Sequence, residues 1–477
     1  MTKTNTVPQA PGGLPVVGHA PRLLRNGALE LLRSLPAHGD LVGVRLGPLS
    51  GTVVCDPELT REMLRHDHIF DKGGPFFGLA RELAGANLAT CPHEQHRRQR
   101  RLVQPAFARD RFPAYGRVMS RRASAVAGDW HSGQVVDVLS DMQRITMSTL
   151  METMFAEELP LPVQRRAIAD LSMIFGGSFL HGIVPNRLAW LPGLRKRLIV
   201  QAGERLRGDL TAIVRGRRTD GTDHGDLLSA LLSSGGKPGA AAPHGPPCGD
   251  AGDSFTEAEI ADQAMALLGA GTDTTAATLA WALHLLAQHP GVQGRLHTEV
   301  DEVLSGGPAH LQHLPYLPLT ARIVTETLRL FPPAWLVPRV VVADTVLGGY
   351  RMPAGATVFY SPYVVHHRGD LFEHPQRFDP DRWDDSRRPQ PPRQAYLPFG
   401  AGARRCIGDQ FAVREAVLAL ATIAARWHLH PVAGRPVTAY PGLELRPRGL
   451  WLRVTARPDH TPKPTPSPEG PVPPRRR

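Results

Sequence analysis

The sequence has no long run of apolar residues, few cysteines and no leader-like start. A helix that spans a membrane needs about 18 or more consecutive apolar residues, so no membrane anchor is expected. Residues 1–20 lack the charged start and the apolar stretch of a signal peptide, which favours a soluble, cytoplasmic protein. Four cysteines in 477 residues are too few for a disulfide framework.

The balance of charge is basic, with a formal net charge of +11 at pH 7. Such an excess is compatible with a nucleic-acid, membrane or acidic protein partner. No block of basic and aromatic residues resembles a nucleic-acid module, and part of the excess comes from three arginines at the end of the chain. The favoured partner is therefore an acidic protein, and nucleic acid is not expected.

Two segments of low complexity divide the chain. Residues 235–253 are dominated by Gly, Pro and Ala and are predicted to form a flexible surface loop. Residues 458–477 are rich in proline and arginine and are predicted to be a disordered tail. Length alone would suggest two or three domains, but the order of the motifs favours a single catalytic domain over residues 1–457.

A long helix is predicted between Thr256 and Pro290. Thr256 and Glu259 form a T-x-x-E capping box, and Pro290 ends the helical pattern. The roughly 32 residues between them would extend about 48 Å and are apolar on nearly every side, so the helix should cross the interior. Strand-like segments are few: a hairpin from residues 41–46 and 52–55, short strands within 340–358, and a second hairpin within 443–454. The predicted class is mainly α with small β-sheets.

The most specific segment is F-G-A-G-A-R-R-C-I-G at residues 399–408, which a helical stretch follows directly. Its glycines allow a tight loop whose backbone approaches a flat, bulky group. Cys406 then lies at a helix N-terminus, where the helix dipole and free N–H groups favour the thiolate. A thiolate ligand donates electron density to iron and favours cleavage of the O–O bond. Arg404 is placed to pair with a negative group beside the iron, such as a haem propionate.

Two other interpretations explain this loop less well. A dinucleotide-binding loop would need a third glycine and a βαβ unit, and the sequence has neither. A cysteine that is simply buried, which is the interpretation for Cys55 and Cys91, would leave the glycines and the arginine at fixed offsets unexplained.

The pattern F-G-x-G-x-R-x-C-x-G resembles that of the cytochrome P450 family and is matched without a gap. The resemblance extends from the PGGLPVVGH segment near the start to about Arg457. It implies the cytochrome P450 fold, with haem b (iron protoporphyrin IX) between the long central helix and the cysteine loop. It also implies that Cys406 is the iron ligand and that the cofactor is bound by Phe399, Gly400, Arg404 and Gly408.

An E-x-x-R pair, Glu326 and Arg329, lies on a predicted helix, where a spacing of three places both side chains on one face. Alone, such a pair is usually a surface ion pair of little energetic value. The segment F-D-P-D-R-W at residues 378–383 is similar to the family's F-x-P-x-R-F. The resemblance therefore implies that Glu326, Arg329 and Arg382 form a buried charge network with a structural role.

The middle of the long helix carries A-G-T-D-T-T at residues 270–275. A mid-helix threonine ordinarily donates to the carbonyl four residues earlier, which is Ala270 for Thr274. An Asp between threonines inside an apolar helix is nevertheless costly unless it has a function. The segment matches the family's A-G-x-D-T-T, which implies that Thr274 hydrogen-bonds bound dioxygen and that Asp273 relays protons to it. Ala270 and Gly271 would let oxygen lie against the backbone.

His96 and Arg100 are four residues apart and share a helical face. They match the family's W/H-x-x-x-R, whose members bind the haem propionates, and Arg339 fits a further propionate partner. Cys91, His93 and His96 are residue types that bind zinc, but no second pair of ligands has suitable spacing.

The remaining arginines of this segment, Arg97, Arg98 and Arg101, form either a solvated basic face or a docking patch for an acidic ferredoxin. The sequence contains no flavin or nicotinamide domain, so ferredoxin and ferredoxin reductase are the expected electron donors, with O2 as co-substrate. A monomer is expected.

Apolar residues occupy the segments that line the distal pocket in the family, which favours a hydrophobic substrate. These residues are Phe76, Phe77, Leu267, Leu268, Trp335, Leu336 and Leu443. The segments HGDLVGVRLGP, FDKGGPFF and HRRQRRLVQPAF resemble those of soluble actinomycete members that oxidise cyclic terpenes. The resemblance implies hydroxylation of a cyclic sesquiterpene, in one or several oxidations, during the biosynthesis of a terpenoid antibiotic.

Other functions remain open. The substrate could instead be a steroid, a fatty acid or a polyketide. Haem-thiolate enzymes that use peroxide, or that isomerise, usually lack the Asp-Thr pair, so residues 273–274 argue against that class. A haem-based sensor or sequestering protein would not need the pair, but its presence does not exclude one.

Overall fold

The computed structural model describes residues 6–22, 27–47, 49–156, 166–171, 173–174, 193–234, 254–387 and 389–457. The predicted loop at 235–253 and the predicted tail at 458–477 lie outside the described residues, and the assignment of residues 1–457 to one domain stays a prediction. Within the described part of the chain, no helix combines the length and the apolar character needed to cross a membrane.

The described residues are mainly helical and carry small sheets, which confirms the predicted class. The helices are α1 (Ala20–Arg22), α2 (Ala28–Ser34), α3 (Pro57–Arg65), α4 (Gly74–Ala84), α5 (His93–Val103), α6 (Phe112–Gly128), α7 (Val138–Phe155), α9 (Gly193–Asp220), α10 (Leu227–Ser233), α11 (Glu257–Gln288), α12 (Pro290–Leu304), α13 (Pro318–Leu330), α14 (Pro362–His366) and α15 (Asp409–Arg426). The strands are β1 (Leu41–Leu46), β2 (Leu49–Val54), β3 (Phe70–Asp71), β4 (Val135–Asp137), β5 (Val337–Val341), β6 (Thr345–Leu347), β7 (Tyr350–Met352), β8 (Thr357–Tyr360), β9 (Trp427–Pro431), β10 (Thr438–Pro441), β11 (Leu445–Arg448) and β12 (Trp451–Ala456).

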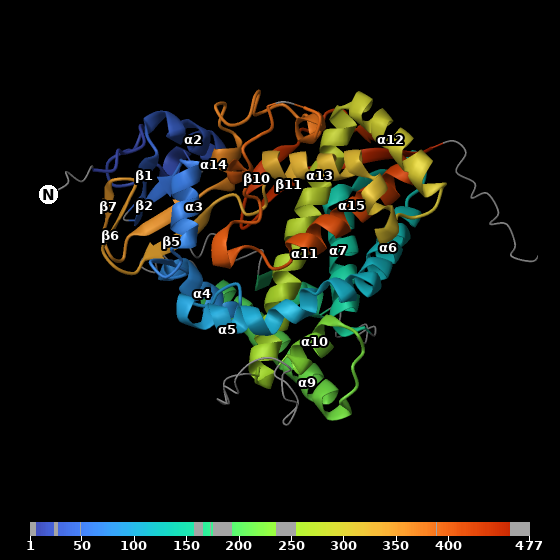
Figure 1. The fold of residues 1–477 in the computed structure, drawn as a ribbon, viewed down its shortest axis with the longest axis horizontal. Coiled ribbons are helices and arrows are strands. Elements are labelled where there is room, and N and C mark those ends of the chain that lie inside the picture. Colours follow the sequence, from blue (N-terminus) through green and yellow to red (C-terminus); the bar gives the residue numbers. More distant parts are fainter. Residues whose placement is uncertain are drawn as a thin grey trace, which may run out of the picture.

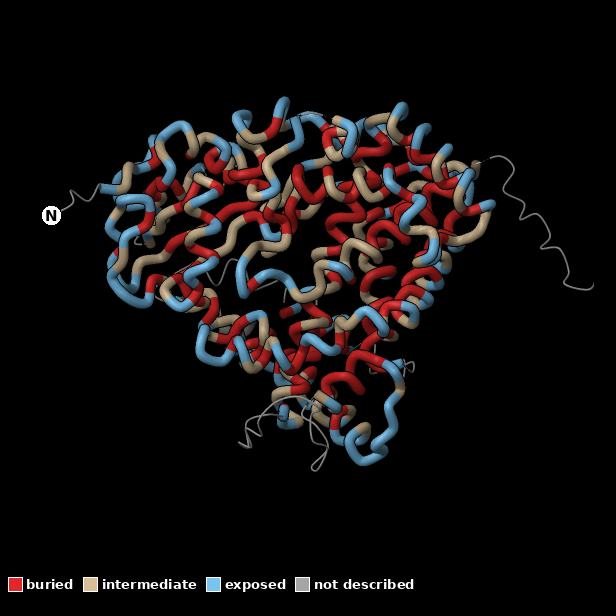
Figure 2. The backbone as a smooth tube through the Cα atoms, viewed as in Figure 1, coloured by how far each residue is buried: buried red, intermediate tan, exposed pale blue. Residues whose placement is uncertain are grey.

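Helix α11 runs through the middle of the molecule (Figure 1). Thr256 caps it with the predicted capping box: the threonine hydroxyl accepts from the Glu259 N–H, and the Glu259 carboxylate accepts from the Thr256 N–H. The main sheet lies towards one end of the molecule beside α2 and α3, while α6, α12 and α15 gather towards the other (Figure 1). Buried residues are concentrated in the interior of the molecule, and exposed residues lie along its outer edge (Figure 2).

The main sheet has the strand order β1-β2-β8-β5-β3. The predicted first hairpin is confirmed, because β1 pairs antiparallel with β2 and Leu41 lies opposite Val54. The predicted late hairpin is wrong: β11 pairs with β10, whereas β12 pairs with β4 and β9. Leu445 of β11 packs in a small core with Trp335, but Leu452 of β12 packs in the large helical core. The two strands separate because their apolar side chains belong to different cores.

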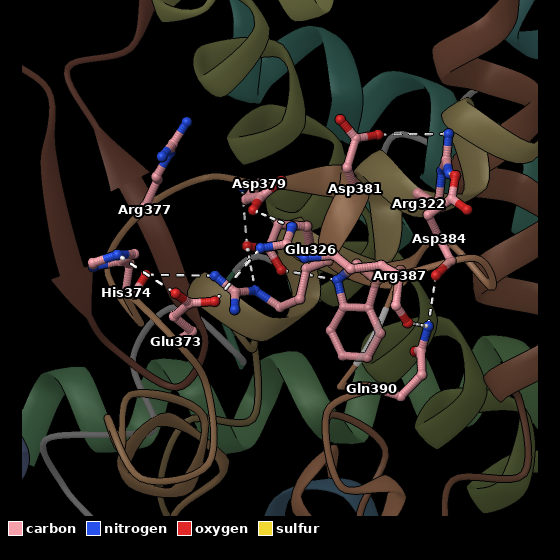
Figure 3. Close-up of polar contacts among 12 residues, drawn as sticks. Arg322, Glu326, Glu373, His374, Arg377, Asp379, Asp381, Asp384, Arg387 and Gln390 are labelled. Carbon is pink, nitrogen blue, oxygen red and sulfur yellow. Dashed lines mark hydrogen bonds and ion pairs between the residues drawn. The ribbon is translucent and has the colours of Figure 1, made fainter.

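The predicted charge network is present around Glu326 (Figure 3). Both oxygens of its carboxylate accept from the Arg329 guanidinium at 2.8 Å, and both side chains have no exposed surface. Arg382 lies 3.4 Å from the same carboxylate, and Trp383 Nε1 donates to it at 2.8 Å. Asp379 donates through its backbone N–H. Because every partner is supplied, the buried charges are compensated, and the network ties α13 to the segment that precedes the cysteine loop.

A second buried carboxyl group, that of Glu415 on α15, has no cationic partner among the described residues. Its Oε1 atom is buried and has no hydrogen-bond partner among the described residues. The same is true of the hydroxyl groups of Thr149 and Thr153 on α7. Burial raises the pKa of Glu415 to about 8, and the neighbouring Thr149 lowers it only in part. The folded protein therefore holds this group protonated near neutral pH.

Glu415 predicts a loss of stability as pH rises. Its folded pKa of about 8 lies above the usual value of 4.5. The folded state therefore binds the extra proton between these two pH values, and stability falls there by about 1.4 kcal/mol per pH unit. Glu415→Gln removes this proton uptake. In urea unfolding, the original protein should lose about 2 kcal/mol more stability than the variant between pH 6 and pH 8. Parallel pH dependence in the two proteins would contradict this account.

Candidate functional site

One face of α11 is accessible at mid-helix, although most of the helix is buried. Ala270 is exposed, and Leu267, Gly271 and Thr274 are half-buried. These positions are three or four residues apart and share a face. Leu268, which was expected beside them, is fully buried in the large core on another side of the helix. A narrow strip of small and apolar residues is therefore open beside the backbone of α11.

The polar residues of this strip have defined partners. Thr274 Oγ1 donates to the Ala270 carbonyl at 2.7 Å, which is the ordinary bond of a mid-helix threonine. Asp273 Oδ1 accepts from Gln143 Nε2 of α7 at 2.8 Å. No ion pair joins Asp273 to a cation in the described residues. Gln143 was not predicted, because nothing in its local sequence distinguishes it from an ordinary helix residue.

The cysteine loop is shaped by two glycines with left-handed backbone. Gly400 and Gly402 both have φ near +68°, and a Cβ on Gly402 would lie 2.4 Å from the Leu64 carbonyl oxygen. The Cys406 N–H donates to the Phe399 carbonyl at 3.0 Å and closes the loop. Cys406 keeps accessible surface and precedes α15, which begins at Asp409.

The predicted influence of the helix N-terminus on Cys406 is present but does not dominate. Burial raises the pKa of the Cys406 thiol, while the N–H of Gly408 and the positive charges of Arg100 and Lys72 lower it less. The helix end therefore lowers the pKa of this thiol by less than burial raises it. A metal ion bound to the sulfur would supply the positive charge that stabilises a thiolate.

Arg404 has carboxylate partners that the sequence did not reveal. Its Nε atom lies 2.8 Å from Asp67, its Nη2 atom 2.8 Å from Asp71, and its Nη1 atom donates to the Cys91 carbonyl at 2.9 Å. The Arg404 side chain is 1 % exposed. We expected a propionate partner, but the protein already supplies the negative charge. We call Arg404, Asp67 and Asp71 the arginine clamp.

The clamp connects the cysteine loop to the start of α5. Asp67 lies 3.1 Å from His93 Nδ1, and Asp71 accepts from the His93 N–H at 2.8 Å. Burial raises the pKa of Asp67, but the hydrogen bonds from His93 and Arg404 lower it more, so the net pKa is below its usual value. The Asp67 carboxylate is therefore held in the charged form that Arg404 needs.

Beside the clamp lie cations without a carboxylate ion pair in the described residues. Lys72 Nζ donates to the Ala89 carbonyl at 2.8 Å, and the Arg339 guanidinium lies over the Tyr360 ring at 5.3 Å. Burial, followed by the charges of Arg339 and Arg404, lowers the pKa of Lys72 to about 7. Burial, followed by the charge of Arg404, lowers the pKa of His96 to about 3.

These observations fit a flat dianion with an iron centre. The uncompensated charges of Lys72 and Arg339 match two carboxylates, which is the number that haem b carries. Cys406 offers an accessible sulfur for iron, and the α11 strip offers small residues against which a planar group can lie. Lys72 and Arg339 would hold the propionates, with His96 adjacent. Arg100 donates instead to the Ala403 and Arg405 carbonyls of the cysteine loop, and its role toward haem stays a prediction.

The zinc alternative finds no support in the structure. The described residues contain no group of three or more His, Cys, Asp or Glu side chains arranged to hold a metal ion. The Cys91 sulfur lies 3.8 Å from the Arg404 guanidinium, and burial raises the pKa of its thiol.

The residues predicted to line a substrate pocket divide into two groups. Trp335 is buried in the small core and donates to the Gly442 carbonyl, and Phe77 is buried beneath Lys72 and Arg339. These two residues, like Leu268, serve packing. Half-buried positions that remain candidates for substrate contact are Phe76, Leu267, Leu336 and Leu443.

The basic residues of α5 also differ from one another. Arg98 lies 2.7 Å from Glu259 and donates to the Ser254 carbonyl, so it supports the first turn of α11. Arg97 and Arg101 are exposed. A docking patch on α5 would therefore depend on Arg97 and Arg101, and Arg98 has a structural role.

Comparison with known proteins adds family evidence. Residues 8–449 match the family described as Cytochrome P450. The chain is 42% identical over 457 residues to pentalenene oxygenase of Streptomyces avermitilis, covering 94% of this chain and 97% of that protein. It is 41% identical to cyclooctat-9-en-7-ol 5-monooxygenase of Streptomyces melanosporofaciens, covering 90% and 91% of the two chains. Cyclooctatin synthase of the same organism is 40% identical, with 91% and 93% covered.

A solved structure has a similar fold. The crystal structure of the cytochrome P450DA heme domain superimposes with a TM-score of 0.80 at 28% identity, covering 95% of this chain and 98% of that one. The agreement extends over almost the whole chain.

The arginine clamp predicts that Asp71 is needed for stability. Asp71→Asn removes one of the two negative charges beside the buried Arg404 guanidinium. Urea unfolding should show a loss of about 3 kcal/mol, as expected for breaking a buried ion pair. Asp344→Asn, which breaks the exposed pair with Arg351, is the matched control and should cost less than about 1 kcal/mol. Equal effects of the two substitutions would show that the clamp does not stabilise the fold.

Proposed function

The chain belongs to the cytochrome P450 family, and we propose that it hydroxylates a cyclic sesquiterpene or diterpene. Members of this family bind haem b and act as monooxygenases, with O2, a hydrophobic substrate and electrons from redox partners. The observation that carries the terpene assignment is the similarity to two Streptomyces relatives whose names specify oxidation of a terpenoid, and to a third that is named cyclooctatin synthase. We place the reaction in the biosynthesis of a terpenoid secondary metabolite.

The open face of α11 supports a substrate with few polar groups. Leu267, Ala270 and Gly271 present no side-chain hydrogen-bond donor. Leu336, just before β5, and Leu443, between β10 and β11, are half-buried apolar residues. Such surfaces bind hydrocarbons by burial and orient them by shape. A terpene hydrocarbon or a terpene alcohol has this chemistry.

Each residue of the site then has a chemical task. When bound, haem b supplies the iron at which O2 is activated for insertion into a C–H bond. Cys406 contributes its sulfur as the iron ligand. Thr274 gives its hydroxyl hydrogen to the Ala270 carbonyl, so its oxygen is free to accept a hydrogen bond. Asp273, held at Oδ1 by Gln143, takes up and releases a proton at Oδ2.

We further propose that ferredoxin and ferredoxin reductase supply the electrons, in the cytoplasm, to a monomeric enzyme. The exposed Arg97 and Arg101 support an acidic ferredoxin as the partner on this face. Such docking would weaken as salt rises, because exposed charges are screened.

Thr274→Ala tests the monooxygenase assignment. The variant should consume NADH but convert a smaller fraction of it into product, because the acceptor oxygen is gone, and the remainder should appear as hydrogen peroxide. We expect the product-to-NADH ratio to fall by about tenfold. The control is Thr272→Ala on the buried side of α11, where Thr272 donates to the Leu268 carbonyl. Undiminished coupling in Thr274→Ala would rule out this role.

The substrate class is tested by visible spectroscopy of the purified haem protein. Titration with pentalenene or with cyclooctat-9-en-7-ol should move the haem from low to high spin, with saturation at micromolar ligand. A thiolate-type spectrum that neither ligand shifts would refute these terpenes and direct the search to steroids, fatty acids and polyketides. Folded protein that binds no haem would refute the enzyme assignment itself.

A further inference from the structure

One face of α7 contacts consecutive residues in the middle of α11. Gln143 Nε2 donates to Asp273 Oδ1 at 2.8 Å. The Met147 sulfur lies 3.7 Å from the hydroxyl of Thr272, the residue before Asp273. Because Gln143 and Met147 are four residues apart, they share a face of α7. This face therefore presents an amide to the acid of α11 and a thioether to its neighbour.

The packing one turn further along α7 leaves α11 little freedom to shift. Leu150 of α7 is buried in the large helical core. A Cβ on Gly271 of α11 would lie 2.8 Å from the Leu150 side chain, which is closer than real Cβ atoms approach their neighbours. The two helices are therefore in close contact at this level. The backbone that carries Asp273 is fixed relative to α7, and so is the reach of the Gln143 amide.

Gln143 is an uncharged partner for Asp273. Both residues are half-buried, and no other side chain of the described residues bonds to this carboxyl group. A carboxylate can only accept hydrogen bonds, so the amide has to present its N–H to it and not its carbonyl oxygen. The bond fixes the Oδ1 atom. The Oδ2 atom has no protein partner in the part of the chain that the structure describes.

An uncharged partner has a consequence for proton transfer. The Gln143 amide does not titrate near neutral pH, so it donates to Oδ1 whether or not Asp273 carries a proton. The oxygen that accepts the N–H is then the carbonyl oxygen of the protonated carboxyl group, and the proton resides on Oδ2. A cation in this place would oppose protonation through its charge, and a neutral donor opposes it less. Gln143 therefore holds Asp273 in place in both of its protonation states.

The proposed reaction depends on the placement of this acid. Hydroxylation consumes one O2, two electrons and two protons, and it yields one alcohol and one water. Thr274, the residue after Asp273, is fixed by its own hydrogen bond to the Ala270 carbonyl at 2.7 Å. Asp273 is fixed by Gln143. Since a displacement of about 1 Å can slow a reaction by about a hundredfold, losing one of these bonds should delay proton delivery.

We propose that Gln143 is the positioning residue of the proton relay, and that its hydrogen bond directs electrons into product instead of hydrogen peroxide. For each proton, the Asp273 Oδ2–H bond breaks, and the proton passes to O2 as it is reduced, directly or through hydrogen-bonded water. Oδ2 then takes a replacement from solvent, while the Gln143 bond to Oδ1 persists. Gln143 neither gains nor loses a proton, and the electrons come from the redox partners. This inference rests on the proposed monooxygenase function.

Gln143→Leu tests the proposal, because it removes the donor and keeps an uncharged side chain of similar size. The measurement is product formed per NADH by the full-length haem enzyme with ferredoxin and its reductase, using a terpene that shifts the spin state. This ratio should fall about tenfold, and the remainder should appear as hydrogen peroxide, because a misplaced acid delivers its proton late. The ratio of the rates of product formation in H2O and D2O should rise, since proton transfer then limits more of the turnover.

Gln143→Glu gives a readout that a purely structural role would not produce. A protonated Glu at this position donates to Asp273 Oδ1 as the amide does, whereas an ionised one repels the Asp273 carboxylate. The product-to-NADH ratio of this variant, divided by that of the original enzyme at the same pH, should be highest at pH 5.5. It should fall about tenfold by pH 9.

Three controls separate positioning from packing. Met147→Leu changes the same face of α7 without touching Asp273 and should leave the product-to-NADH ratio and the isotope effect as they are. Turnover driven by hydrogen peroxide brings its own protons and should be equal in Gln143→Leu and the original enzyme. The haem content and the terpene Kd from the spin-state titration should also be equal.

Other outcomes overturn the proposal. An unchanged product ratio and isotope effect in Gln143→Leu would show that Gln143 does not position the acid. Loss of the peroxide-driven reaction, or the same defect in Gln143→Glu at every pH, would mean that Gln143 holds the fold instead. Failure of the proposed function looks different, because the original enzyme would then form no product from terpenes with either oxidant. In that case the peroxide released per NADH, with any ligand that shifts the spin state, compares Gln143→Leu with the original enzyme.

Discussion

The arginine clamp is the interaction on which the site depends. A guanidinium group that is almost without exposed surface must be neutralised, and Asp67 and Asp71 do so from a segment at the other end of the sequence. Because the same two carboxylates hold the start of α5 through His93, one charge cluster fixes the cysteine loop relative to that helix. With Arg404 satisfied, the neighbouring Lys72 and Arg339 are left for an external dianion. The charge balance of the protein thus ties the cysteine loop to α5 and leaves two cations that would hold a charged cofactor.

Residues 270–275 of helix α11, on the opposite side of the proposed site, form no ion pair within the part of the chain that the structure describes. On α11 the feature of the proposed site is a lack of bulky side chains, since Ala270 and Gly271 leave the backbone accessible at the middle of a helix that is mostly buried. The polar residues there are held by neutral partners: Thr274 by a carbonyl and Asp273 by an amide. The cofactor side of the proposed site is therefore held by ion pairs, whereas Thr274 and Asp273 on α11 are held by hydrogen bonds to neutral partners.

Local pattern was enough to predict the elements that local chemistry determines. The capping box at Thr256, the length of α11, the first hairpin and the pairing of Glu326 with Arg329 all follow from residues close in sequence. Contacts between distant segments were not predictable in the same way. Asp67 is 337 residues from Arg404, and no spacing rule connects them. The late hairpin failed because the sequence shows that Leu445 and Leu452 are apolar but not that they belong to separate cores.

The pairing of β12 with β4 and β9 has a consequence for biosynthesis of the chain. A nascent polypeptide leaves the ribosome from its N-terminus, and β4 cannot complete its sheet until β12, the last described strand, has emerged. The same delay applies to the ion pairs of Asp67 and Asp71, which cannot form until Arg404 has been synthesised. Long-range closure of this kind is slow, because the entropy of ordering the intervening chain is lost before the contacts form. The nearly complete chain therefore has to stay soluble with an open sheet edge, and substitutions that expose apolar surface should reduce yield in cells before they reduce activity.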